Sequence, residues 1–175
     1  MPLPLLLWQT HLRHVTDIAL AREDETAAGL SNELGYHLRS IGDYGSAHPY
    51  YQRALAIREK ALGPDHDNEA LLQATALSLN NFGYLMRAMG NLVEARPYFE
   101  RALAISEKAL GPEHTDTATS LNNLAILAYY EEDLAEAARL MRRALAIREQ
   151  RLGSKHPDTQ SSRESLSVIE SQLGG

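Results

Sequence analysis

The chain has 175 residues, of which 44% are hydrophobic and 6% aromatic, and its formal net charge is −6. It has no cysteine, which excludes disulfides and thiolate sites and fits a reducing compartment. The negative charge offers no electrostatic footprint for nucleic acid, and no apolar run approaches the length of a membrane span. We therefore expect a cytoplasmic protein without a nucleic-acid or membrane partner.

Residues 1–24 predict a helix that differs from the rest of the chain. Leu12, Val15 and Ala19 lie at helical spacing, with Trp8 nearby. The segment lacks the motifs that recur after it, so we interpret it as a degenerate N-terminal helix. It either caps the helices that follow or, in a chain cut from a longer array, leaves a surface for self-association.

Residues 25–156 contain one pattern three times. RALAIREKALGPDH at 53–66 returns as RALAISEKALGPEH at 101–114 and RALAIREQRLGSKH at 143–156, at offsets of 48 and 42 residues. Similar blocks precede each copy, at 31–47, 79–95 and 121–137. A period of this size indicates stacked supersecondary units. We divide the single repeat domain into repeat 1 (25–66), repeat 2 (67–114) and repeat 3 (115–156).

Each repeat predicts two antiparallel helices and no strand, because the apolar residues recur at steps of three, four and seven. Gly63-Pro64 and Gly111-Pro112 are expected to end the second helices, since glycine takes the left-handed cap and proline cannot continue the helix. Small residues are expected where the two helices approach each other closely: Gly35, Gly83 and Ala125 on the first helices, and Ala47, Ala95 and Ala137 on the second.

Two further features depart from a uniform repeat. Repeat 2 carries six additional residues within 67–78, which is not a whole number of turns at about 3.6 residues per turn, so part of the insertion must loop out. Residues 157–175 predict a capping helix with Leu166 and Ile169 facing inward and a polar remainder, as a stack of helices requires at its end.

The motifs resemble those of the tetratricopeptide repeat. The matching residues are Leu34-Gly35, Gly42-Asp43-Tyr44, Ala47, Tyr51 and Ala54-Leu55 in repeat 1, and Phe82-Gly83, Gly90, Ala95, Phe99 and Ala102-Leu103 in repeat 2. Repeat 3 departs with Ala125, Glu132 and Met141. The 42-residue unit exceeds the usual ~34 and resembles the repeats of kinesin light chains and of bacterial nucleotide-binding signalling ATPases. The resemblance implies an all-α, right-handed helix-hairpin solenoid that binds proteins.

A concave groove along the first helices is the predicted binding site. Its candidate residues are Asn32, Tyr36 and Arg39 in repeat 1, Asn80, Asn81, Tyr84 and Arg87 in repeat 2, and Asn122, Asn123, Ile126, Tyr129 and Tyr130 in repeat 3. Asparagine suits a peptide backbone, arginine a carboxylate, and tyrosine offers stacking area with a polar tip. In the resembling kinesin light chains, such asparagines and basic residues meet cargo peptides. The alternative is that these are solvated helix residues, with some asparagines bonding neighbouring repeats.

We expect a partner with acidic and apolar residues. Tyr36 and Arg39 are three apart, as are Tyr84 and Arg87, so each pair shares a helix face. Repeat 3 has Tyr129 at the place of Arg39 and Arg87. This predicts that the acidic part of the ligand lies over the first two repeats.

Nothing in the sequence indicates an enzyme, a cofactor or a metal site. Nucleotide-binding and nucleophile motifs are missing. His66, His114 and His156 recur at the repeat period, too far apart to share a metal, and we expect a structural role for them just before the next helix. The pair His11 and His14 has no third ligand nearby.

Three functions from different classes remain open at this point. The leading hypothesis is a scaffold that binds a peptide or a partner protein. The second is a sensor fragment of a larger nucleotide-binding signalling ATPase, which an upstream P-loop domain in the reading frame would reveal. The third is self-association through the N-terminal helix.

Overall fold

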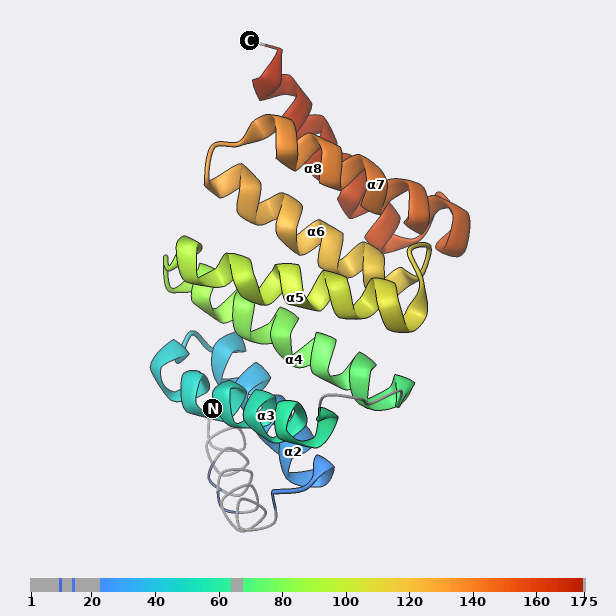
Figure 1. Cartoon of the computed structure of the whole chain (residues 1–175). Coiled ribbons are helices and arrows are strands. Elements are labelled where there is room, and N and C mark those ends of the chain that lie inside the picture. Colours follow the sequence, from blue (N-terminus) through green and yellow to red (C-terminus); the bar gives the residue numbers. More distant parts are fainter. Residues whose placement is uncertain (1–9, 11–13, 15–22, 64–67, 175) are drawn as a thin grey trace. The chain divides into compact units, whose positions relative to one another are not determined.

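A computed structural model describes residues 23–63 and 68–174, together with Thr10 and His14. These ranges contain helices and no strand. The helices are α2 (Glu25–Ser40), α3 (Tyr44–Leu62), α4 (Glu69–Ala88), α5 (Leu92–Leu110), α6 (Thr115–Tyr130), α7 (Leu134–Leu152) and α8 (Pro157–Leu173), labelled in Figure 1. The helix predicted over 1–24 lies almost entirely outside the described residues.

The chain forms two compact units, residues 1–66 and 67–175. In the first unit, α2 and α3 pack as a hairpin around buried side chains that include Leu34, Leu38 and Tyr51. A second set, Ala27, Ala28 and Ile57, is buried near the end of the hairpin opposite its turn, with Leu30 packed against it. Arg58 is only 5% exposed, and its guanidinium donates to the Glu25 carboxylate across the two helices at 2.6 Å.

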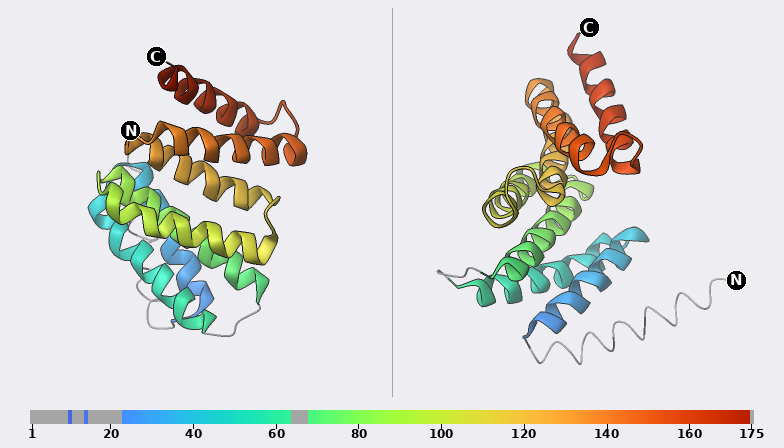
Figure 2. Two further views of the ribbon diagram at one scale, coloured as in Figure 1. Left: turned by 45° about the horizontal axis from the view of Figure 1, so that its top comes forward. Right: turned by 90° about the vertical axis from the view of Figure 1, so that its right-hand side faces the viewer.

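The second unit contains two further hairpins and a final helix. Helix α4 packs on α5, α6 on α7, and each hairpin on the helix that follows it, while α4 also contacts α6 (Figure 2). This succession of antiparallel helices places α4 and α6, the first helices of the two hairpins, side by side. Ile169 of α8 is buried and Leu166 half-buried. The polar residues of α8 predicted to face outward are exposed, namely Ser161, Arg163, Glu164, Ser167, Glu170 and Gln172, whereas Thr159 and Ser162 are buried.

The helix starts follow from capping side chains. The His114 and His156 Nδ1 atoms accept hydrogen bonds from the backbone N–H groups of Asp116 and Asp158, at 3.1 and 3.2 Å, and so begin α6 and α8. This confirms the structural role predicted for these two histidines. His66 lies outside the described residues, and Asn68 caps α4 in its place by accepting from the Leu71 N–H at 3.1 Å.

The insertion in repeat 2 divides between helix and loop. Helix α4 has 20 residues and α6 has 16, so four additional residues lengthen α4 by about one turn. Six residues (63–68) separate α3 from α4, against four (111–114) between α5 and α6, so the other two lie in the connection. A single added turn keeps the apolar face of the helix in phase, which the full six residues could not.

The turns inside the three hairpins differ in backbone strain, which the sequence pattern does not indicate. Gly42 and Gly90 adopt φ values of 81° and 84°, and Glu132 holds the same place in the third hairpin at φ 64°. A residue with a Cβ pays roughly 1–2 kcal/mol in this left-handed region, whereas glycine does not. The turn after α6 is therefore strained relative to the other two.

We expect Glu132→Gly to raise the free energy of unfolding by about 0.5–1 kcal/mol, because relief of the strain exceeds the extra entropy of the unfolded glycine. The reciprocal variant Gly90→Glu should lose a similar amount. Chemical unfolding of both variants checks the pair. Equal stability of all three proteins would show that the turn relaxes without cost.

Candidate functional site

The two predicted tyrosine–arginine pairs form within their own units. In the first unit, the Arg39 guanidinium carbon lies 4.8 Å from the centroid of the Tyr36 ring, and Tyr36 is 51% exposed. In the second, the Arg87 carbon lies 4.7 Å from the Tyr84 ring. Both are cation–π contacts between residues three apart on a first helix. The arginines are half-buried against the rings, and less exposed than the sequence suggested.

The second unit adds a tyrosine from the next hairpin to this pair. The Arg87 guanidinium carbon also lies 5.2 Å from the Tyr130 ring, so the cation contacts tyrosines of α4 and of α6. The rings of Tyr130 and Tyr129 pack edge to face, with their centroids 5.9 Å apart. The Tyr129 hydroxyl accepts a hydrogen bond from Gln172 at 2.9 Å. Among the described residues, no carboxylate pairs with Arg87. Its charge is thus oriented by aromatic rings and left available to an anion.

An apolar hollow adjoins these tyrosines. Ile126, Tyr129 and Tyr130 of α6 line a pocket of about 280 Å³ with three residues of α8. The α8 residues are Ser165, Val168 and Ile169, and Val168 is 51% exposed. The apolar end of the predicted groove therefore coincides with a depression in the second unit that an apolar side chain can enter.

The predicted asparagines divide by burial. Asn32 and Asn80 are 5% and 8% exposed, while Asn81, Asn122 and Asn123 are half-buried. The Asn80 amide donates to the Ser120 hydroxyl at 2.9 Å and its oxygen accepts from Asn123 at 3.1 Å. Asn80 thus bonds the neighbouring repeat, which is the alternative role that the sequence left open for the asparagines.

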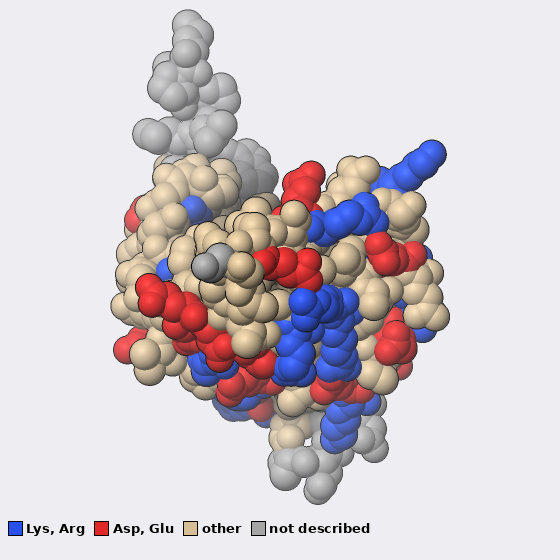
Figure 3. Space-filling view, turned by 90° about the horizontal axis from the view of Figure 1, so that it is seen from above, with Lys and Arg blue, Asp and Glu red and all other residues tan. Residues whose placement is uncertain are grey.

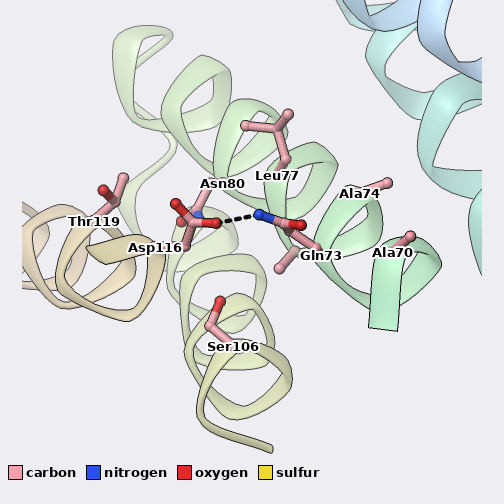
Figure 4. Close-up of a pocket in the computed structure, with 9 residues that line it drawn as sticks. Ala70, Gln73, Ala74, Leu77, Asn80, Ser106, Asp116 and Thr119 are labelled. Atoms are coloured by element: carbon pink, nitrogen blue, oxygen red, sulfur yellow. Dashed lines mark hydrogen bonds between the residues drawn. The ribbon is translucent and has the colours of Figure 1, made fainter. Parts of the chain in front are cut away.

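A second pocket was missed by the sequence-based reasoning. It has a volume of about 420 Å³ and lies between the first helices α4 and α6, with Ser106 of α5 at its base (Figure 4). Gln73 donates to the Asp116 carboxylate across it at 2.6 Å. Its other lining residues are Ala70, Ala74, Ala76, Leu77, Asn80 and Thr119. The signal was the serine of RALAIS, where the other two copies have arginine.

Charges elsewhere in the second unit are mostly paired. At the end formed by α7 and α8, basic and acidic side chains lie next to one another (Figure 3). Arg142 pairs with Glu170 at 2.7 Å and Arg163 with Glu149 at 2.6 Å. The hydrogen bond from Arg139 holds the pKa of Glu136 below its ordinary value. Arg142 and Arg163 are thus paired with carboxylates, whereas the guanidinium of Arg87 lies against aromatic rings.

None of the helices described here is both long and apolar enough to cross a membrane.

Comparison with protein families gives two matches, both to models described as tetratricopeptide repeat. One covers residues 72–150 and the other residues 28–68. Together they span the three helix hairpins described above. No curated protein matches the sequence.

Solved structures with the same arrangement of helices include BtubC (BKLC) from P. vanneervenii, with a TM-score of 0.77 at 24% identity. The alignment covers 93% of this chain and 65% of that one, so the chain spans about two thirds of its length. Two Podosopora anserina structures, described as kinesin light chain nearly identical TPR-like repeats, have TM-scores of 0.75 and 0.74 at 22% and 23% identity. The alignments cover 86% of this chain and 69% and 68% of theirs. These likenesses confirm the predicted all-α helix-hairpin repeat fold.

Proposed function

The chain belongs to the tetratricopeptide repeat family, whose repeats indicate a protein-interaction scaffold, and from this premise we propose that it binds an extended peptide segment along its first helices. The bound segment carries acidic and apolar residues. It lies across α4, α6 and α8 in the second unit. Within the first unit, Tyr36 and Arg39 form a pair of the same kind.

The observation that carries this proposal is the environment of Arg87. A guanidinium held against Tyr84 and Tyr130, with no carboxylate partner among the described residues, is oriented in advance for an incoming anion. The hollow beside Tyr129 and Tyr130 then accepts an apolar residue a short distance along the same ligand. On a protein of net charge −6, a local positive site of this kind selects partners more than it adds affinity.

A random-peptide display library supplies candidate ligands for this surface. We expect the selected peptides to combine acidic and apolar residues. Arg87→Glu should weaken their binding by about tenfold or more and flatten its dependence on salt, because the charge that attracts the acidic residue is reversed. Arg39→Glu, alone and combined with Arg87→Glu, measures the part played by the first unit.

Lys108→Glu is the matched control, since it makes the same charge change at an exposed position of α5, a second helix. Its affinity should stay within about twofold of the wild type, and circular dichroism should show that all variants keep their helix content. If Arg87→Glu and Lys108→Glu bind the selected peptides equally well, the first-helix surface is not the binding site. Light scattering on the same samples reports self-association, the competing role.

A further inference from the structure

One position of the repeated fourteen-residue stretch differs in chemistry between the copies. It is Arg58 in the first copy, Ser106 in the second and Arg148 in the third. All three side chains are buried, with exposures of 5%, 1% and 8%. Two copies thus place a guanidinium inside the molecule, and the middle copy replaces it with a hydroxymethyl group.

Arg148 shows how the second unit holds a guanidinium at this position. Its Nη1 donates to the Ser162 hydroxyl at 2.6 Å, the Asn122 side-chain oxygen at 3.2 Å and the Asp158 carbonyl at 3.3 Å. Burial lowers the pKa of Arg148, and the nearby Asp158 carboxylate opposes that effect. The site is therefore made by α6 of its own hairpin and by α8, the next first helix.

Each residue that bonds Arg148 has a counterpart of the same type near Ser106. Asn80, Ser120 and Asp116 stand 42 residues before Asn122, Ser162 and Asp158. With no guanidinium present, Asn80 bonds Ser120 and Asn123, and Asp116 bonds Gln73. The Ser106 hydroxyl is buried without a hydrogen-bond partner and points into the pocket of about 420 Å³ (Figure 4).

We propose that this pocket, the Ser106 pocket, receives an arginine side chain from the bound peptide. The residues that hold the Arg148 guanidinium in the third copy have counterparts around Ser106, but the second copy has no guanidinium. The Asp116 carboxylate, the Ser106 and Thr119 hydroxyls and the Asn80 side-chain amide line this pocket. Their oxygens suit a planar cation with five donors. Leu77, 52% exposed at the rim, provides an apolar wall for the arginine stem.

The choice of a peptide arginine rests on the proposed scaffold function. Asn80 and Arg87 are seven residues apart on α4, or about 10 Å, which an extended peptide crosses in about three residues at ~3.3 Å each. A ligand of this surface therefore carries an arginine about three residues from its acidic residue. The two charges of such a ligand complement Asp116 and Arg87.

N-acetyl-arginine amide is the probe, because it presents the side chain without a free amino or carboxylate group. Titration of the full chain, followed by the NMR amide signals of Gln73, Asn80 and Ser106, should show saturable binding. N-acetyl-citrulline amide, the neutral isostere, and N-acetyl-lysine amide should bind at least fivefold more weakly. Free arginine should bind no better than the blocked form.

Ser106→Arg places in the second copy the residue that the first and third copies have. We expect it to fold, with equal or higher thermal stability, and to reduce binding of the probe at least tenfold. Ala104→Arg is the matched control, because it adds the same side chain at an exposed position of the same helix and should bind like the wild type. Ser106→Ala, which keeps the pocket open, should bind more weakly than wild type and more tightly than Ser106→Arg.

Three results would overturn the inference: no binding of the probe to the wild type, equal binding by Ser106→Arg, or equal binding of the citrulline analogue. Tighter binding of free arginine would assign the pocket to a small molecule and overturn the peptide source. The probe needs no partner, so its failure leaves the peptide-display result untouched. Conversely, loss of the Arg87 effect leaves the probe result standing.

Discussion

Gly83→Ala is expected to destabilise the second unit by about 1–3 kcal/mol relative to an alanine substitution made where space is free. A Cβ at Gly83 would lie 2.8 Å from Cε1 of Phe99, a fully buried residue, so the ring or the backbone must shift to admit it. Overpacking of this kind costs about 1–3 kcal/mol in a close-packed interior. The methyl group is small, but it falls where α4 packs against the Phe99 ring of α5.

Gly29→Ala on α2 is the reference, because nothing lies within 4 Å of the added Cβ there. It should gain about 0.5–1 kcal/mol from the helix preference of alanine. Since both glycines lie inside helices, this preference cancels in the comparison and the remaining difference reports the clash. Native-state hydrogen exchange measures the two sites separately, which matters because they lie in different compact units.

The third hairpin indicates how the clash is relieved. Ala125 replaces the glycine there, and Met141 replaces the aromatic residue, and both are fully buried. Combining Gly83→Ala with Phe99→Met should therefore cost less than the sum of the single changes, by about 1 kcal/mol. A strictly additive double variant would mean that the ring is not what excludes the methyl group.

The hairpins could be predicted because each depends on a local pattern that is repeated in register. Apolar spacing set the helices, and Gly63 and Gly111, which were predicted to end second helices, adopt positive φ values of 53° and 91°. A structural role for His114 followed from its place before a helix start, and the structure identifies that role as helix capping. Such features require only residues close in sequence, and three copies of each reduce the chance of misreading one of them.

The candidate site was less predictable because its residues meet across hairpins. The contact of Tyr130 with Arg87 joins α6 to α4, and the burial of Asn80 depends on Ser120 and Asn123 in the next repeat. Helical spacing places a residue on a face, but it does not say how closely the neighbouring helix covers that face. The sequence shows Ser106 as a difference between the copies. Its consequence could be inferred only once the structure showed which residues surround Arg148.

We expect Arg148→Ser to lower the free energy of unfolding by about 2–3 kcal/mol and to loosen α8. The arginine bonds Asn122 of α6 and two groups of α8, so its loss removes three hydrogen bonds of about 1 kcal/mol each and the packing of its stem. Asn122 can turn to Ser162, as Asn80 turns to Ser120, which limits the damage. Exchange of the α8 amides should accelerate more than that of α4.

The same substitution should open a second guanidinium site. Arg148→Ser recreates between α6 and α8 the arrangement that Ser106 has between α4 and α6, so the variant should bind two equivalents of N-acetyl-arginine amide where the wild type binds one. The exchanged variant, Ser106→Arg with Arg148→Ser, should bind one equivalent again, with the perturbed amides moved from Gln73 and Asn80 to Asn122 and Ser162. Binding that stays at Asn80 in the exchanged variant would contradict the shared origin of the two sites. A site that moves with the serine would show that repeats 2 and 3 form the same guanidinium-binding site, and that Arg148 occupies it in repeat 3.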